Sequence, residues 1–352
     1  MVDSDNERGC IAWDEKTGGF VHDESRCKGH GADPLHLPGA AALPARKRPP
    51  RLDSWVTHQR RQRIAYTDAI TPIEAAMTAV AAPVQDHTIA LNGLRFHYRD
   101  WPNPGAQALV LLHGFTGHAR SWDTFAAAMQ DRYRVLALDQ RGHGETQWAD
   151  AYGADLMVED VQAFVTALGL KQFVLLGLSM GGRNAYHFAA RHPEEVQRLV
   201  IVDIGPEIVA AGSTRIQAGV QARDVFDSPE EAVVAARAGN PRAPDDALRH
   251  RVTHNLMQRP DGKWTFRFDA KLRAPGGTPP RPEPAAAWAL LPKIGCPTLL
   301  IRGAESDVLG VKTAARMVRE IPDCRLVTVP DSGHSVPLDN PPGFLAATRT
   351  FL

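Results

Sequence analysis

One serine in this 352-residue sequence has the surroundings of a nucleophile. Ser179 lies in the pattern GLSMG, between Gly177 and Gly181, where the apolar run FVLLGL gives way to the helical pattern GGRNAYHFAARHP. A nucleophilic serine on a sharp strand-to-helix turn crowds the residues two before and two after it, so both must be small. The N–H groups that begin the following helix also favour developing negative charge. The pattern therefore predicts that Ser179 attacks a carbonyl.

A general base and an orienting acid can be sought by the same logic. His334 lies in VPDSGHSVPLDNP, just after the last apolar run, where a loop histidine can reach a serine hydroxyl. Asp203 ends the run RLVIVD, and Asp307 follows PTLLIRGAES. Either aspartate could instead cap the next helix or turn. The residues alone leave the acid open between Asp203 and Asp307.

Acyl transfer also needs two donors for the tetrahedral oxyanion. The residue after the nucleophile, Met180, supplies one backbone N–H in a turn of this kind. The loop HGFTG, which follows the run ALVLLH, supplies the other, and we assign it to Phe115. His113 adjoins a buried strand, so it is interpreted as a brace of this loop and not as a base.

The elements that must position these residues alternate regularly from about residue 86. Short apolar runs at 108–113, 134–139, 173–179, 198–203, 297–303 and 325–330 are typical of strands buried on both faces. Helical patterns separate them, which predicts an α/β fold with a mostly parallel central sheet and helices on both faces. Residues 87–101 precede them and predict a hairpin that turns at Asn92-Gly93. Ligands of such sheets bind at the carboxyl ends of the strands, where the candidate residues converge.

A long interruption separates Asp203 from the next buried run. A loop of that length without structure is uncommon in a compact domain, so an inserted helical cap is predicted. Its aromatic residues either line an apolar substrate pocket or anchor the cap to the core. They are Trp264, Phe266, Phe268 and Trp288. The predicted division is an extension at 1–84, an α/β core at 85–204, a cap at 205–291 and the rest of the core at 292–352.

The extension differs in composition from the rest of the chain. It is rich in Gly, Pro and charged residues, as disordered segments are, and its basic run from Arg46 to Arg63 is interpreted as a solvated linker. Its cysteines and histidines match no common zinc spacing. These are Cys10, His22, Cys27 and His30. Met77 begins MTAVAAPVQDHTIALNG, and a further hypothesis is that translation starts at or near Met77, so that the preceding segment is not native protein.

The amino-acid composition limits the classes of partner that the protein is expected to bind. The 40 Lys and Arg residues balance the 40 Asp and Glu residues, which gives no electrostatic case for nucleic acid or an anionic membrane. Four irregularly spaced cysteines argue against a disulfide scaffold. No stretch has the length of a membrane span, and the N-terminus lacks the apolar segment of a signal peptide. A cytoplasmic protein with a small-molecule substrate is expected. The oligomeric state is left open.

The motifs HGFTG, DQRGHG, GLSMGG, VDIGP and DSGH, in this order, resemble the α/β-hydrolase family over residues 86–352. The resemblance implies the α/β-hydrolase fold, a Ser-Asp-His triad and no metal or cofactor. Within the family, the lid-bearing hydrolases of small molecules look most similar. They include esterases, enol-lactonases, carbon–carbon bond hydrolases and the acetamidomethylene-succinate hydrolases.

The resemblance also bears on the acid. In the subgroup that shares the VDIxP pattern the acid follows the sixth strand, which corresponds to Asp203. The commoner family arrangement places an aspartate in the seventh-strand loop, three residues after a glycine. Here Ser306 stands three residues after Gly303, and Asp307 comes one later. This departure favours Asp203.

The function expected from these residues is that of a serine hydrolase. It would cleave a small carboxylic ester, lactone or amide through an acyl-enzyme. One alternative is a carbon–carbon bond hydrolase of the same fold, although those enzymes usually carry Asn before the serine, where this chain has Leu178. Another is a ligand-binding receptor on a hydrolase scaffold with little turnover, since fold does not dictate function.

Overall fold

The computed structural model describes residues 11–14, 19–22, 82–274 and 283–352. The chain divides into two compact units, Met1–Arg60 and Arg61–Leu352. In the first, β1 (Ile11–Asp14) pairs antiparallel with β2 (Gly19–His22). The sequence predicts no regular structure here, because strands of four residues are too short to show an alternation. The hypotheses on the basic run and on a start at Met77 rest on residues outside the described ranges. Of the four residues considered as zinc ligands, His22 alone lies inside them.

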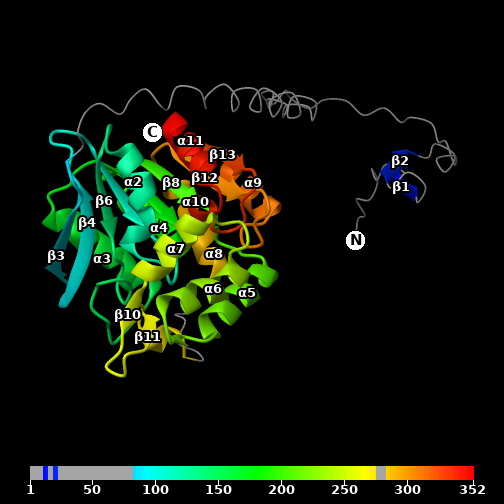
Figure 1. Ribbon diagram of the computed structural model, residues 1–352. Helices are drawn as coiled ribbons and strands as arrows, with labels where there is room; N and C mark the ends of the chain where they lie inside the picture. Colours follow the sequence, from blue (N-terminus) through cyan, green and yellow to red (C-terminus); the bar gives the residue numbers. More distant parts are fainter. Residues whose placement is uncertain (1–10, 15–18, 23–81, 275–282) are drawn as a thin grey trace, which may run out of the picture. The chain divides into compact units, whose positions relative to one another are not determined.

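An eight-stranded sheet forms the centre of the second unit, in the order β13-β12-β8-β7-β5-β6-β4-β3 (Figure 1). The strands from β5 to β13 in this sheet pair parallel, and β3 and β4 form an antiparallel edge. Their bounds are β3 (Gln85–Leu91), β4 (Leu94–Trp101), β5 (Ala108–Leu112), β6 (Arg134–Leu138), β7 (Phe173–Leu178), β8 (Val196–Val202), β12 (Thr298–Gly303) and β13 (Cys324–Val329). This topology confirms the predicted fold class.

The hairpin of β3 and β4 turns where the sequence predicts. Asn92 and Gly93 both have positive φ, 50° and 78°. A two-residue turn with this backbone matches the twist of the two strands, and Asn-Gly is the pair that adopts it most readily. Leu91 therefore pairs with Leu94, and the register of the whole edge is set by this turn.

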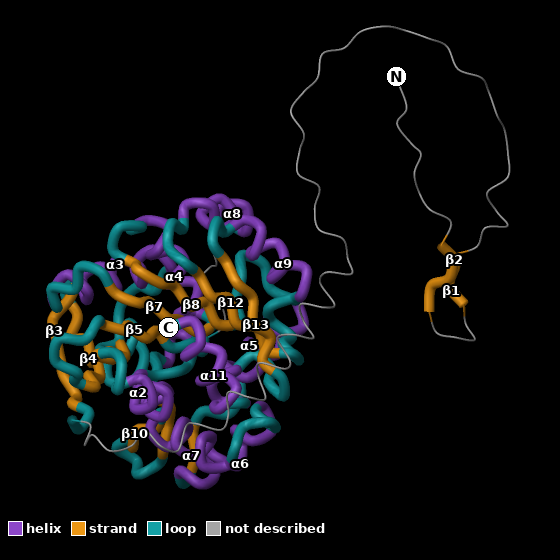
Figure 2. Tube along the Cα trace, turned by 90° about the horizontal axis from the view of Figure 1, so that it is seen from above, coloured by secondary structure: helices purple, strands orange, loops and turns teal. Residues whose placement is uncertain are grey.

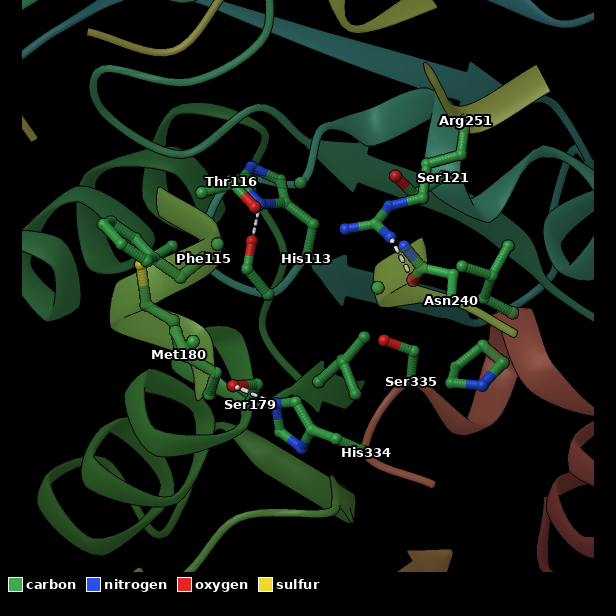
Figure 3. A pocket seen from close by; sticks show the side chains of 18 of the residues that line it. His113, Phe115, Thr116, Ser121, Ser179, Met180, Asn240, Arg251, His334 and Ser335 are labelled. Atoms are coloured by element: carbon green, nitrogen blue, oxygen red, sulfur yellow. Dashed lines mark hydrogen bonds between the residues drawn. The ribbon is translucent and has the colours of Figure 1, made fainter. Parts of the chain in front are cut away.

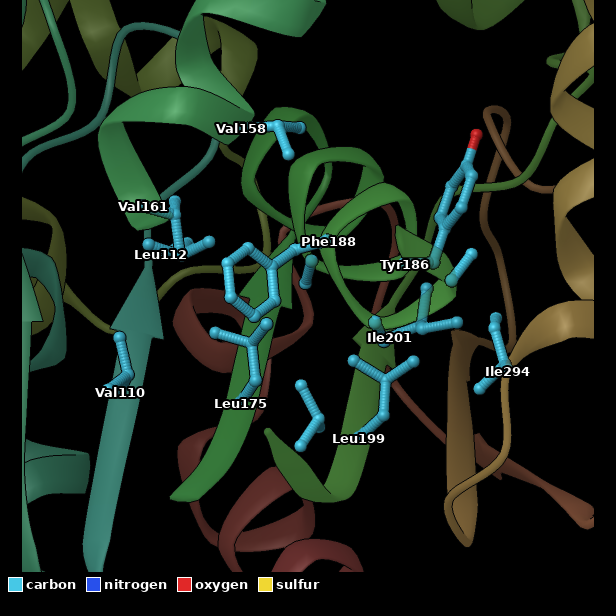
Figure 4. Close-up of a cluster of buried hydrophobic side chains, with 14 of the residues drawn as sticks. Val110, Leu112, Val158, Val161, Leu175, Tyr186, Phe188, Leu199, Ile201 and Ile294 are labelled. Atoms are coloured by element: carbon cyan, nitrogen blue, oxygen red, sulfur yellow. The ribbon is translucent and has the colours of Figure 1, made fainter. Parts of the chain in front are cut away.

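Two hydrophobic layers cover the two faces of the sheet. Alternate residues of each central strand point to opposite faces: Leu175 joins one cluster, whereas Val174 and Leu176 join the other. Figure 4 shows the first cluster, in which α3 (Ala154–Ala167) and α4 (Met180–Arg191) pack on the strands. Also on this face are α8 (Pro284–Leu290) and α9 (Val311–Glu320). The opposite face holds α2 (Asp123–Met129) and α11 (Pro341–Phe351). Both faces of the central strands are buried, which explains their apolar runs in the sequence, whereas the edge strands β3 and β13 are partly exposed.

Residues 205–291 interrupt the sheet between β8 and β12. They form α5 (Ala210–Gln221), α6 (Pro229–Gly239) and α7 (Asp245–His254), with a small antiparallel sheet of β10 (Leu256–Gln258), β11 (Trp264–Phe266) and β9 (Val225–Phe226). Figure 2 shows α6, α7 and β10 grouped at one side of the central strands. We call these six elements the cap. The sequence predicts a helical cap, with helices where α6 and α7 lie, but neither α5 nor the small sheet.

The last part of the predicted cap packs differently. Although α8 lies within residues 205–291, its Trp288 belongs to the same hydrophobic cluster as α4 and the central strands. The cap has a separate small cluster of its own, which includes Phe226 and Leu248. In its packing α8 is therefore a core helix. In the described part of the chain, no helix combines the length and apolarity that a membrane span requires.

Candidate active site

Ser179 lies on the turn between β7 and α4. Its backbone has φ 53° and ψ −114°, a conformation that costs a non-glycine residue about 1–3 kcal/mol. A Cβ added to Gly177 would lie 2.2 Å from the carbonyl oxygen of Gly181. One added to Gly181 would lie 2.2 Å from the carbonyl oxygen of Leu112. The turn is thus as crowded on both sides of Ser179 as the sequence predicts.

His334 bridges Ser179 and Asp203. Its Nε2 lies 2.9 Å from Ser179 Oγ, and its Nδ1 lies 2.9 Å from Asp203 Oδ2. Figure 3 shows the imidazole beside the serine hydroxyl at the wall of a cavity. With the proton on Nδ1, the ring donates to the carboxylate and its Nε2 is free to accept the serine proton. Residues from three separate loops at the carboxyl ends of the strands therefore form one hydrogen-bonded chain.

The carboxylate of Asp203 is fully buried, and its hydrogen bonds are satisfied. Oδ1 accepts the N–H of Gly303 at 3.0 Å, and Oδ2 accepts the hydroxyl of Ser306 at 2.5 Å. The Ser306 oxygen accepts in turn from the N–H groups of Val308 and Leu309, at 3.1 and 3.0 Å. A buried charge is tolerable only with such partners, and here they also fix its orientation.

Asp307, the other candidate acid, points elsewhere. It forms a two-point ion pair with Arg215 of α5, with Nε to Oδ2 at 2.6 Å and Nη2 to Oδ1 at 2.7 Å. Arg215 lowers the pKa of this carboxyl. Among the described residues, the structure brings Asp203 and not Asp307 within hydrogen-bond distance of His334.

The loop after β5 lies against the serine. A Cβ on Gly114 would be 3.4 Å from the Cβ of Ser179. The buried His113 donates from Nδ1 to the carbonyl of Gly114 at 2.8 Å, and its Nε2 accepts the N–H of Gln140 at 3.0 Å. Burial lowers the pKa of His113 to about 4, so the ring is neutral at pH 7 and can make both bonds. This geometry agrees with the interpretation of His113 as a brace.

Phe115 and Met180 both line the cavity next to Ser179 (Figure 3). Met180 is the first residue of α4, where a helix leaves its N–H groups without intrahelical acceptors. Phe115 precedes Thr116, which has φ 62° and whose carbonyl accepts the side-chain amide of Asn255 at 2.8 Å. The end of α7 in the cap thereby helps to fix the loop.

The cavity over Ser179 has a volume of about 1250 Å³ and lies between the cap and the carboxyl ends of the strands. Phe266 and Phe268 line it, but Trp264 and Trp288 do not, which corrects the predicted pocket. Trp264 packs in the cap's own cluster. Trp288 lies in the core, where its Nε1 donates to Glu207 at 2.9 Å. Residue type alone cannot separate a cavity wall from an anchor.

Two further features of the site cannot be recognised in the sequence. In the sequence Ser306 stands out only as a departure from the family pattern, whereas in the structure its hydroxyl donates a hydrogen bond to Asp203. Arg215 and Arg251 of the cap both line the cavity, and no spacing in the sequence pointed to them. Among the described residues, no group of three or more His, Cys, Asp or Glu side chains could hold a metal ion.

The class of α/β hydrolases is defined by a mostly parallel sheet that carries a serine on a strained turn. In that class a histidine links the serine to a buried aspartate, as it does here. The family model for the alpha/beta hydrolase fold matches residues 107–341, and the chain belongs to this family.

The matches to known proteins span most of the length of each relative. The 3-hydroxybutyrate-oligomer hydrolase of Cupriavidus necator is 29% identical over 271 residues, which are 73% of this chain and 92% of the relative. The N-formylmaleamate deformylase of Pseudomonas putida is 30% identical over 266 residues, 75% of this chain and 95% of that protein. The crystal structure of E-2-(acetamidomethylene)succinate hydrolase has a TM-score of 0.70 at 23% identity and covers 76% of this chain and 99% of that one. The relatives support a hydrolase as the class of enzyme.

Proposed function

We propose that this chain is a serine hydrolase that cleaves a small carboxylic ester through an acyl-enzyme. The observation that carries the proposal is the continuous chain of hydrogen bonds from Ser179 through His334 to Asp203, with both contacts at 2.9 Å. Nucleophile, base and orienting acid are recognised by such geometry and not by position in the sequence. Family membership and the hydrolase names of the relatives agree with it.

The proposed reaction has two halves. Ser179 Oγ attacks the ester carbonyl carbon while His334 Nε2 takes the hydroxyl proton. The N–H groups of Phe115 and Met180 hold the oxyanion, and His334 returns the proton to the leaving alcohol oxygen as the carbon–oxygen bond breaks. Water then loses a proton to His334 and attacks the acyl-enzyme, which releases the acid and restores the serine. Asp203 orients the ring and stabilises the imidazolium in both halves.

The cap is proposed to enclose the substrate. Phe266 and Phe268 contribute aromatic side chains to the wall of the cavity, and apolar walls with a few polar groups are typical of small-molecule sites. The names of the relatives include an oligomer hydrolase and a deformylase, so esters, lactones and amides all belong in a substrate panel.

A covalent probe tests the proposal. We expect a fluorophosphonate to label the protein at Ser179 and a p-nitrophenyl ester to give a burst of product followed by steady turnover. Ser179→Ala should abolish both. The matched control is Ser228→Asn, which removes a cap serine but keeps a side-chain acceptor for the N–H of Glu231 at the start of α6. A folded wild-type protein with no labelling and no turnover would instead support the receptor alternative.

A further inference from the structure

The cavity is strongly asymmetric in charge although the whole chain carries no formal net charge. The described residues that line it include five arginines and a single acidic side chain. These are Arg120, Arg183, Arg215, Arg223, Arg251 and Asp331. A cleft lined by one sign of charge, with walls of low dielectric constant, raises the local concentration of ligands of the opposite sign. The lining therefore favours an anionic substrate.

Three of these arginines already have carboxylate partners. Arg120 pairs with Asp86 at 3.1 Å, Arg215 with Asp307 at 2.6 Å, and Arg223 with Glu231. Their charges are largely neutralised where they stand. They are therefore not the groups best placed to take a substrate charge.

Arg251 differs from these three. In the described part of the chain, its guanidinium has one hydrogen-bond partner, the neutral side-chain oxygen of Asn240, at 3.3 Å from Nη1. No described carboxylate lies within 4.0 Å of it. Figure 3 shows the side chain projecting into the cavity, into the same space that Ser179 and Met180 face. Asp339 attracts this guanidinium electrostatically but forms no ion pair with it. A half-buried cation without a direct partner is costly, and a bound anion would reduce that cost.

The position of Arg251 is fixed by the core. Its backbone carbonyl accepts from His118 Nε2 at 2.9 Å, and burial lowers the pKa of His118 to about 4, so this donor is a neutral ring. One helical turn later, Asn255 donates to the carbonyl of Thr116 at 2.8 Å. The last turn of α7 is thereby fastened to the loop that adjoins Ser179. The backbone of Arg251 therefore has a defined place relative to the nucleophile.

We propose that Arg251 binds a free carboxylate of the substrate, so that the substrate is an ester with a second, ionised carboxyl group. This inference rests on the proposed ester hydrolysis at Ser179. Asn240 occupies Nη1, and the remaining N–H groups of the planar guanidinium can donate in parallel to both oxygens of a carboxylate. Asn240 then acts as a positioning residue that sets the plane of the guanidinium.

The test compares two esters of equal chain length, neutral p-nitrophenyl pentanoate and anionic mono-p-nitrophenyl glutarate. Arg251→Gln should lower kcat/KM for the glutarate ester roughly 10- to 100-fold, as expected for a lost charge-assisted bond, and leave the pentanoate value within about threefold. Arg251→Lys should keep the charge but lose the planar fork, and so retain part of the preference. Arg249→Gln is the matched control, because Arg249 lies on the same helix and pairs with Glu230 outside the cavity.

A binding measurement keeps this proposal separate from the proposed function. Glutarate is titrated calorimetrically into the Ser179→Ala protein and into the Ser179→Ala/Arg251→Gln protein; binding to the first and loss in the second supports the carboxylate site even if no ester is cleaved. Equal losses with both esters would assign Arg251 to holding the cap. Absence of glutarate binding, or binding of inorganic phosphate alone, would also overturn the proposal. If Arg251→Gln fails to fold by circular dichroism, Arg251→Lys carries the comparison of the two esters.

Discussion

Ser306 and Asp203 meet because the loops that hold them leave neighbouring strands. β8 and β12 pair parallel, with Val202 opposite Ile301, so both chains leave the sheet at the same edge. A carboxylate on either loop could be directed at the base. In this chain Asp203 fills that place from β8, and the serine hydroxyl from the β12 loop donates to it at 2.5 Å. One aspartate and one serine thus share the space beside His334.

This geometry makes the two candidate acids separable. Asp203→Asn keeps the shape of the side chain but presents the wrong hydrogen-bonding pattern to His334, so kcat for a p-nitrophenyl ester should fall roughly 10³- to 10⁴-fold. Asp307→Asn breaks only the partly exposed pair with Arg215, and we expect a loss of less than about tenfold. Circular dichroism checks that both proteins fold. The reverse order of losses would assign the acid to Asp307.

At the scale of the elements, the turn between β7 and α4 has no room for a side chain at position 177. A Cβ there would lie 2.2 Å from a backbone oxygen, which cannot rotate away as a side chain can. Gly177→Ala should therefore lower the free energy of unfolding by about 3 kcal/mol, at the upper end of typical overpacking.

Urea unfolding followed by tryptophan fluorescence measures this effect. Gly295→Ala is the matched control, since its nearest heavy atom would be the Cβ of Pro193 at 3.8 Å, an ordinary contact. We expect that control to stay within about 0.5 kcal/mol of the wild type. Equal urea midpoints for the two variants would show that the turn can relax.

The elements also show what a sequence can and cannot predict. The six apolar runs all form strands, each within two residues of its predicted ends. Five of them are mostly buried, and a strand buried on both faces needs apolar residues throughout; the sixth, β13, is a partly exposed edge strand. The strands of the cap have only two or three residues and leave no period of their own. Asp203 and Asp307 both follow parallel strands, so only the direction of each side chain separates them. Such directions depend on contacts between distant residues.

At the scale of the whole molecule, a group of buried histidines links the fold to pH. Burial lowers the pKa of His113 and of His118 to about 4, and that of His143 to about 3. His97 behaves in the opposite way, because its contact with Asp139 outweighs its burial and raises its pKa. His250 shares this direction, because its hydrogen bond to Asp123 raises its pKa. Three neutral rings near the loop at Ser179 thus oppose two rings that are more readily protonated.

This balance predicts a protein that is destabilised by mild acid. Between pH 6.5 and about 4 the unfolded chain protonates these three histidines while the folded chain does not, so the free energy of unfolding falls as the pH falls. The opposing contribution of His97 is present below pH 6.5 and is lost as the pH rises through its folded pKa. We expect the free energy of unfolding measured with urea to be lower at pH 5 than at pH 7.5, by on the order of 1–2 kcal/mol per buried histidine, and the urea midpoint to fall with it. His143→Asn, whose amide can still donate to the carbonyl of Arg141, should weaken this dependence, whereas a midpoint unchanged from pH 7.5 to pH 5 would show that the buried rings accept protons in the folded state.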